Sequence, residues 1–128
     1  MEYYELVNKN IILADRAKLF DNFLFKCKGL MFSKPLKKGQ ALILASKDEG
    51  ILETTIHMFF VFFSIDIIWL NKDKIVVDKK EKVKPFIPWL SPRKAAKYVL
   101  ELPKNTAKHI KLGDLLEIKK INPKELLK

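Results

Sequence analysis

The sequence is poor in cysteine, and this shortage excludes several classes of site. Cys27 is the single cysteine among 128 residues. Neither an intrachain disulfide nor a zinc site built on several cysteines is therefore possible. The N-terminus also lacks the basic and apolar pattern of a secretion signal. Together these features predict a reducing, cytoplasmic setting.

Glycine is scarce as well, with only four residues that lie far apart in the chain. No glycine-rich phosphate loop, dinucleotide-binding GxGxxG or GxSxG nucleophile motif is present. The metal-binding HExxH pattern is also missing. The sequence therefore predicts no cofactor and no metal site.

No apolar run is long enough to cross a bilayer as a helix. The longest, residues 56–70, is shorter than the ~20 residues that a spanning helix needs, and it contains His57, Ser64 and Asp66. An ionisable side chain at the bilayer centre is strongly unfavourable. We interpret the run as buried strands, with no membrane span.

Negative charge is in short supply, which leaves a formal net charge of +10 and a pI near 9.7. A field of this sign attracts polyanions such as nucleic acid. Only Arg16 and Arg93 are arginines, however, and the rest of the basic residues are lysines. Readers of bases and phosphates favour arginine, whereas lysine enrichment is typical of hyperthermophile proteins. Nucleic-acid binding is thus possible but less favoured than a compositional bias.

The residues present form short β-prone runs separated by turn signals. Runs 3–7 and 11–14 flank an Asn-Lys-Asn turn, and runs 65–70 and 75–77 flank Asn71–Lys74; both pairs indicate hairpins. Further strands are predicted at 41–45, 51–58, 79–84, 97–102 and 115–118, a turn at 46–50, and helical turns at 20–30, at 103–110 and in the C-terminal tail.

This spacing predicts a mainly β fold, an antiparallel β-sandwich or a partly closed β-barrel, with two or three short helices. The length fits one domain, which we place at residues 1–118. Residues 119–128 are predicted to form a short basic C-terminal tail.

Several segments together resemble one known family. Residues 28–32 (KGLMF) resemble its GLMF helix end, and 56–58 with 64–70 resemble its W-M-x-N-T-x-x-P-L-D-I-x-F-L block. Residues 98–102 and 112–114 resemble its Y-V-L-E-L and V-G-D elements. The order holds from about residue 14 to 118, and the chain resembles the domain of unknown function 192, an uncharacterised ancient conserved region. The resemblance implies a mainly antiparallel β domain and no particular activity.

The chain departs from that family pattern at its most polar stretch. Where the family often has tryptophan followed by Met-Lys-Asn-Thr, this sequence has His57-Met58 followed by Phe59-Phe60-Val61, and Ser64 replaces the proline before the isoleucine–aspartate pair. A function that depends on the family's lysine, asparagine and threonine is therefore not expected here.

His57 and Asp66 are the candidate catalytic pair. If the chain reverses between them, they lie on neighbouring strands, where the carboxylate would raise the imidazole pKa and fix its tautomer. The simpler interpretation is a hydrogen bond that satisfies two buried polar groups, and we favour it. Glu53 and Glu101 are further candidates for a cleft, although alternation places Glu101 opposite Leu100 and Leu102, most simply toward solvent. His109 is expected at the surface.

The run of phenylalanines at 59–63 falls on a predicted reversal. Contiguous exposed apolar residues mark interfaces or grooves, and the alternative is that the run plugs the core. The leading hypothesis is a non-enzymatic module that binds a small molecule or a protein partner at an end formed by residues 57–66 and 86–92. The alternatives are a nucleic-acid binder and a hydrolase-like enzyme that uses His57 and Asp66. The candidate ligand-binding residues are Met58, Phe60, Phe62, Trp89, Glu53 and Glu101.

Overall fold

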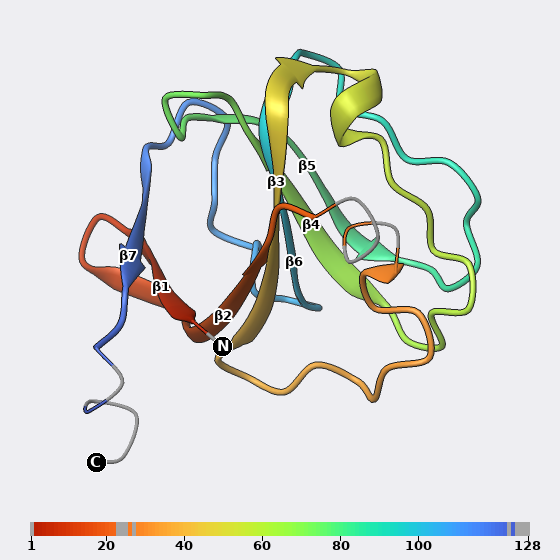
Figure 1. Cartoon of the computed structure of the whole chain (residues 1–128), viewed down its shortest axis with the longest axis horizontal. Helices are drawn as coiled ribbons and strands as arrows, with labels where there is room; N and C mark the ends of the chain where they lie inside the picture. Colours follow the sequence, from red (N-terminus) through yellow and green to blue (C-terminus); the bar gives the residue numbers. More distant parts are fainter. Residues whose placement is uncertain (1, 23–25, 27, 123, 125–128) are drawn as a thin grey trace.

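A computed structural model of the chain shows one curled β-sheet (Figure 1). The structure describes residues 2–22, 26, 28–122 and 124. Seven strands lie in the order β5-β4-β6-β3-β2-β1-β7. Their bounds are β1 Tyr3–Asn8, β2 Ile11–Phe20, β3 Gln40–Gly50, β4 Ile65–Leu70, β5 Val76–Val83, β6 Ala96–Pro103 and β7 Leu116–Lys120.

The sheet curls until its two edge strands nearly meet. β2 and β3 run parallel, and the other strand pairs are antiparallel. An isolated bridge joins Ile75 to Leu115, next to the starts of the edge strands β5 and β7. The fold is therefore a half-barrel. Of the two predicted architectures, the partly closed barrel is confirmed, and the sandwich is wrong because all strands belong to a single sheet.

Side chains on the concave face form what we call the inner core. All seven strands contribute to it, and three of its members on β2 and β3 are alanines, which allow the curled sheet to close tightly on itself. Its fully buried members include Ile68 and Leu70 of β4 and Leu100 and Leu102 of β6.

The opposite, convex face carries a second cluster, the outer core. Among the described residues, its buried strand members come from β3, β4, β5 and β6 and include Leu44, Trp69 and Val99. Loop residues such as Met58 and Leu90 cover them, and the partly buried Phe20 of β2 packs against the cluster. Every residue of β4 is buried, because one face of this strand points into each core. This two-sided burial explains the unbroken apolar run in its sequence.

Both predicted hairpins are confirmed. β1 pairs with β2 across a turn in which Lys9, rather than an asparagine, has a positive φ of 58°. β4 pairs with β5 across a turn closed by the Asn71 side chain, which accepts hydrogen bonds from the amides of Asp73 and Ile75. The two runs predicted at 75–77 and 79–84 form the single strand β5.

The prediction is wrong between residues 46 and 58. The expected turn at 46–50 is the end of β3, and the expected strand at 51–58 is replaced by a 3-10 turn, Leu52–Thr54. The Thr54 hydroxyl donates to the Gly50 carbonyl at 2.8 Å, and Trp69 Nε1 donates to the Thr54 carbonyl at 2.8 Å. These tertiary bonds outweigh the β propensity of the segment.

The described residues show fewer helices than the two or three predicted. In the described part of the chain, the 3-10 turn Leu52–Thr54 is the one helical element with defined bounds. Residues 104–109 form a series of turns. Of the predicted helix at 20–30, Phe20 belongs to β2, and residues 26 and 28 are helical, with the Lys26 amide donating to the Asn22 carbonyl at 2.9 Å. Residues 23–25 and 27, and most of the predicted C-terminal turn, lie outside the described residues.

Candidate functional site

A cavity of about 400 Å³ lies against the outer face of the sheet. Its floor is the ladder between β3 and β6, where Leu44 pairs with Val99 and Leu42 pairs with Glu101. Because side chains alternate along a strand, Leu44, Val99 and Glu101 all point to this face. The floor is therefore apolar except for one carboxyl group.

Three parts of the described chain wall the cavity: residues 26 and 28–30, the end of β3 with the following 3-10 turn, and residues 55–61. The apolar wall residues are Leu30, Leu52, Ile56 and Val61. The polar wall residues are Lys26, Lys28, Ser46, Lys47, Asp48, Glu53, Thr54, Thr55 and His57.

Glu101 is the unusual group in this cavity. It is 5% exposed, and among the described residues its carboxyl group has no hydrogen-bond or ion-pair partner. Burial in this setting raises the pKa of Glu101 to about 7, because desolvation penalises the charged form. The carboxyl lies beside the chain at Gly29, where an added Cβ would stand 3.6 Å from Oε1.

The predicted solvent exposure of Glu101 is wrong, although its predicted facing is right. Leu100 and Leu102 point to the inner core, so Glu101 points to the opposite face. That face is covered in this protein by residues 26, 28–30 and 51–61, which form the cavity walls. The alternation of side chains along a strand shows which face a residue points to, but not whether other segments cover that face.

His57 and Glu53 line the same cavity as Glu101. His57 is half-buried; its Nδ1 accepts a hydrogen bond from the Phe59 amide at 3.1 Å, and its ring lies 5.3 Å from that of Phe59. Glu53 is exposed at the rim and folds back over Gly50. Three of the sequence-predicted polar candidates are thus brought to one site.

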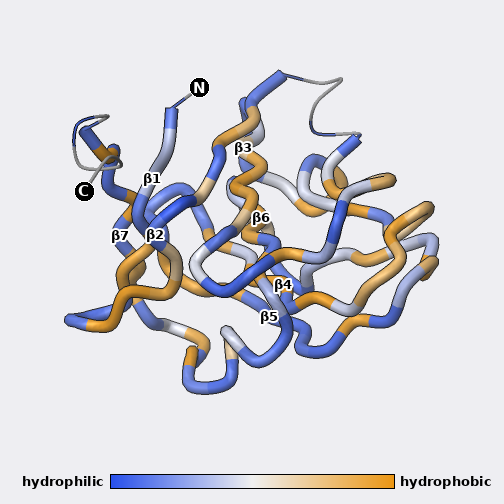
Figure 2. Tube along the Cα trace, turned by 90° about the horizontal axis from the view of Figure 1, so that it is seen from below, coloured by the Kyte–Doolittle hydropathy of each residue, from blue (hydrophilic) through white to orange (hydrophobic). Residues whose placement is uncertain are grey.

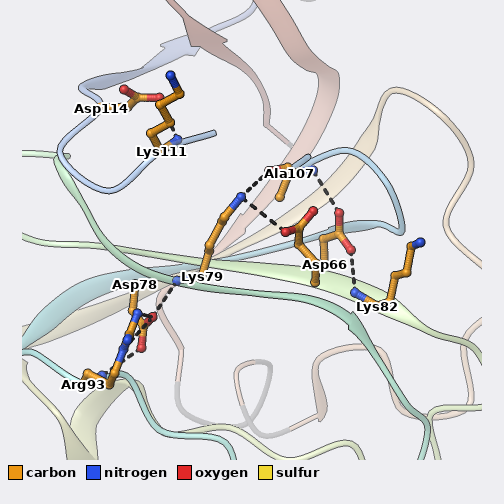
Figure 3. Close-up of polar contacts among 9 residues, drawn as sticks. Asp66, Asp78, Lys79, Lys82, Arg93, Ala107, Lys111 and Asp114 are labelled. Atoms are coloured by element: carbon orange, nitrogen blue, oxygen red, sulfur yellow. Dashed lines mark hydrogen bonds and ion pairs between the residues drawn. The ribbon is translucent and has the colours of Figure 1, made fainter. Parts of the chain in front are cut away.

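Asp66 is not part of that site. It is fully buried on the inner face, where Oδ1 accepts from the Lys82 amide at 2.8 Å and Oδ2 from the Ala107 amide at 2.9 Å (Figure 3). Lys82 has a φ of 50°, so the aspartate holds a kink of β5 and the 104–110 turns in place. The sheet separates Asp66 from His57, and the predicted pair is not formed.

A second buried aspartate, Asp78, anchors a loop on the outer face. Asp78 accepts hydrogen bonds from the Arg93 amide at 2.9 Å, from the Arg93 side chain at 2.8 Å and from the Lys79 amide (Figure 3). Burial of Asp78 opposes its ionisation, but these hydrogen bonds outweigh it and hold the pKa of Asp78 below its usual value. Both aspartates therefore anchor loops through backbone amides.

The remaining sequence-predicted residues differ in how far their side chains are buried. Met58 is 1% exposed and belongs to the outer core. Phe60, Phe62 and Trp89 are exposed at 45%, 61% and 64%, so the 59–63 run both plugs the core, through Val61, and presents rings to solvent. His109 is exposed as predicted.

Sequence reasoning missed Lys26, Lys28 and Ser46 as cavity residues. Ser46 gave no signal, because hydroxyl residues are common in turns and edges. The two lysines flank Cys27, which lies outside the described residues. Within the described part of the chain there is no cluster of three or more potential metal ligands. Among the same residues, no helix is long and apolar enough to span a bilayer.

Comparison with known proteins agrees with the resemblance read from the motifs. Residues 6–118 match the model of the DUF192 family, described as an uncharacterized ancient conserved region. The chain belongs to this family. A UPF0127 protein from Pyrococcus abyssi is 38% identical to it over 114 residues, covering 86% of this chain and 92% of that protein.

Two solved structures share the fold of this DUF192 member. One, a protein of unknown function from Novosphingobium aromaticivorans, has a TM-score of 0.79 at 23% identity and covers 89% of this chain and 82% of its own. The other, a putative transcription regulator from Sinorhizobium meliloti, has a TM-score of 0.79 at 20% identity, with coverages of 91% and 92%. At this identity the likeness concerns the fold alone.

Proposed function

We propose that this DUF192 domain is a small-molecule-binding module, and that its ligand sits in the outer-face cavity with a hydrogen-bond donor, such as an amine, against Glu101. The observation that carries this proposal is a carboxyl group 5% exposed in a cavity, with no partner among the described residues. A buried polar group without a partner is unfavourable. A ligand donor would satisfy it.

The cavity has the composition of a ligand site. Its volume of about 400 Å³ lies in the usual range for small-molecule pockets. Its floor is apolar apart from the Glu101 carboxyl group, and polar side chains line much of its walls. The apolar residues, such as Leu44 and Val99, would contact the ligand body, and Glu101 would select its head group.

An ammonium head group would keep Glu101 ionised when it binds. Because the pKa of Glu101 in the unliganded cavity is about 7, binding at or below this pH releases a proton. Affinity for an amine should therefore rise with pH up to about 7 and then level off.

Calorimetric titration with primary alkylamines, from butylamine to octylamine, and with the matching alcohols tests the proposal. At pH 8 we expect the amines to bind at least about tenfold more tightly than the alcohols, since a charge-assisted hydrogen bond contributes more than a neutral one. Glu101→Gln should remove this difference, while Glu117→Gln on exposed β7 leaves it unchanged. Equal affinity for amines and alcohols, or no binding at all, would refute the proposal.

An acid–base enzyme is the second candidate, and one observation favours it. His57 and Glu101 line the same cavity, and a carboxyl group with a pKa near 7 suits general acid–base work. This version replaces Asp66 by Glu101 as the carboxyl partner. It requires a hydrolysis rate, measured with model esters such as p-nitrophenyl butyrate, that both His57→Ala and Glu101→Gln abolish. A rate unaffected by either change rules it out.

A further inference from the structure

Five exposed phenylalanines gather where three loops meet. The loops are residues 28–38, 55–64 and 84–91. In Figure 1 the last two lie on the right, on the side opposite β7, and the first begins there and runs along the bottom toward the start of β3. Hydrophobic stretches of the chain appear at the same end in Figure 2. We call this group the aromatic surface; it comprises Phe32 (69% exposed), Phe59 (45%), Phe60 (45%), Phe62 (61%) and Phe86 (44%).

Four of these rings contact one another and make a continuous apolar patch. Phe32 stacks on Phe60 with ring centroids 4.8 Å apart, and Phe62 meets the edge of Phe86 at 5.1 Å. Phe60 and Phe86 join the two pairs at 6.1 Å. Contiguous exposed apolar groups of this kind mark interaction sites.

The backbone holds these rings outward in a disfavoured conformation. Phe32, Phe60 and Phe86 have φ values of 58°, 56° and 64°, a region that bulky residues rarely adopt. The Phe32 amide donates to the Phe60 carbonyl at 2.9 Å, and the Phe86 amide donates to the Met58 carbonyl at 2.9 Å. The loops are thus tied together around an exposed patch.

The charges of the same three loops all have one sign. They contain no aspartate, glutamate or arginine. They carry five exposed lysines: Lys28, Lys34, Lys37, Lys38 and Lys84. The partner of this surface should therefore combine an apolar layer with negative charge.

We propose that the aromatic surface docks on an anionic lipid bilayer, with the phenylalanine rings in the interface and the lysines among the headgroups. Exposed rings flanked by lysines are the recognition chemistry of interfacial membrane binding. Single-stranded nucleic acid fits less well, because Phe32 already stacks on Phe60 and the flanking cations include no arginine. This inference is independent of the cavity and of Glu101.

Vesicle co-sedimentation of the full chain tests it. With phosphatidylcholine vesicles that contain about 30 mol % phosphatidylglycerol, we expect partitioning at least about tenfold above that with pure phosphatidylcholine, and a decrease with added salt. Phe60→Ser with Phe62→Ser should lower partitioning about tenfold or more. Lys34→Gln with Lys84→Gln should lower it about fivefold or more on the anionic vesicles only.

Matched controls come from the far end of the molecule. Ile11 and Ile12 are also exposed, at 62% and 56%, and Ile11→Ser with Ile12→Ser should leave partitioning unchanged. Lys108→Gln with Lys111→Gln is the charge control. Thermal unfolding confirms that each variant is folded, and the lysine variants test the proposal if the phenylalanine pair is not. Equal partitioning to both vesicle types, no effect of either set of changes, or binding to single-stranded DNA in place of vesicles would overturn the proposal.

Discussion

The inner and outer faces of the sheet bury apolar side chains in different ways. All seven strands supply the inner core, whereas the outer core joins four strands to loop residues. Each face also buries one acidic residue of the neighbouring strands β4 and β6. Asp66 on the inner face accepts two backbone amides, and Glu101 on the outer face has no partner among the described residues.

This difference distinguishes a carboxyl group with a structural role from one that is accessible to a ligand. A satisfied and fully buried carboxylate such as Asp66 fixes the chain around it and is out of reach of a ligand. The unsatisfied carboxyl of Glu101 opens on a cavity, because loops cover a convex face less completely than strands fill a concave one. Loops carried by a rigid sheet are also where binding sites commonly lie.

The largest expected effect compares two leucines. Leu100→Ala in the inner core should lower the free energy of unfolding by about 4 kcal/mol, and Leu90→Ala in the outer core by about 2 kcal/mol. Leu100 is 0% exposed between strands that cannot move inward, while Leu90 lies in a loop that can relax. Urea unfolding followed by Trp69 fluorescence measures both. Equal losses would mean that the two cores are equally rigid.

The next effect is a pH dependence that belongs to the outer face. The pKa of Glu101 rises from 4.5 to about 7 on folding, so between these values the folded state holds a proton that the unfolded state has lost. The contribution of Glu101 to the free energy of unfolding should therefore be greatest below pH 4.5. It should fall by roughly 3 kcal/mol as the pH rises to 7.

Glu101→Gln should remove this decrease and leave the protein more stable than the wild type at pH 8. Urea titrations at a series of pH values measure it, with Glu117→Gln as the exposed control. A wild-type stability that does not fall between pH 5 and 7 would contradict the burial argument.

A smaller effect compares the two anchoring aspartates. Asp66→Asn should lower the free energy of unfolding by about 2.5 kcal/mol, since its amide can accept through one oxygen only and leaves a buried backbone amide unpaired. Asp78→Asn should lower it by about 1.5 kcal/mol, because it anchors a loop at the surface. Hydrogen exchange at Ala107 and Arg93 reports each lost anchor. The reverse order would place the tighter anchor on the outer face.

The smallest effect concerns Arg93 alone. The pKa of Asp78 lies below its usual value, so its stabilising contribution is present above the unfolded-state pKa and is lost as the pH falls through the folded-state pKa. Arg93→Ala removes the side-chain donor at 2.8 Å and keeps the backbone ones. The acid-unfolding midpoint should move to higher pH, as circular dichroism can show. Arg16→Ala is the exposed control; an unchanged midpoint would assign the anchor to the backbone bonds.

Much of the sheet could be predicted from the sequence. The run at 65–70 is mostly apolar and contains three isoleucines, and the run at 97–102 contains Tyr98, Val99 and two leucines. Both form strands, β4 and β6. The segment 51–58 looked equally strand-like, but Thr54 is fixed by bonds to Gly50 and Trp69. Such partners lie four and fifteen residues away, and local propensity does not register them.

The candidate site could be predicted only in part. His57, Glu53 and Glu101 were all identified as polar residues near apolar runs, yet nothing in the sequence indicates that they share a cavity, or that Asp66 lies across the sheet from them. Which face of β6 contacts solvent depends on where residues 26, 28–30 and 51–61 lie. That position is set by packing between distant segments.

The sequence by itself determined a single basic, mainly β chain, its two hairpins and its DUF192 membership, because alternation, turn residues and family motifs are local properties. Only the tertiary structure decided that the strands curl into one half-barrel, that Glu101 is buried beside a cavity and that five phenylalanines share one surface. Those features depend on which loop covers which face. The position of each loop over the sheet is set by long-range packing and backbone hydrogen bonds. No local sequence pattern specifies it.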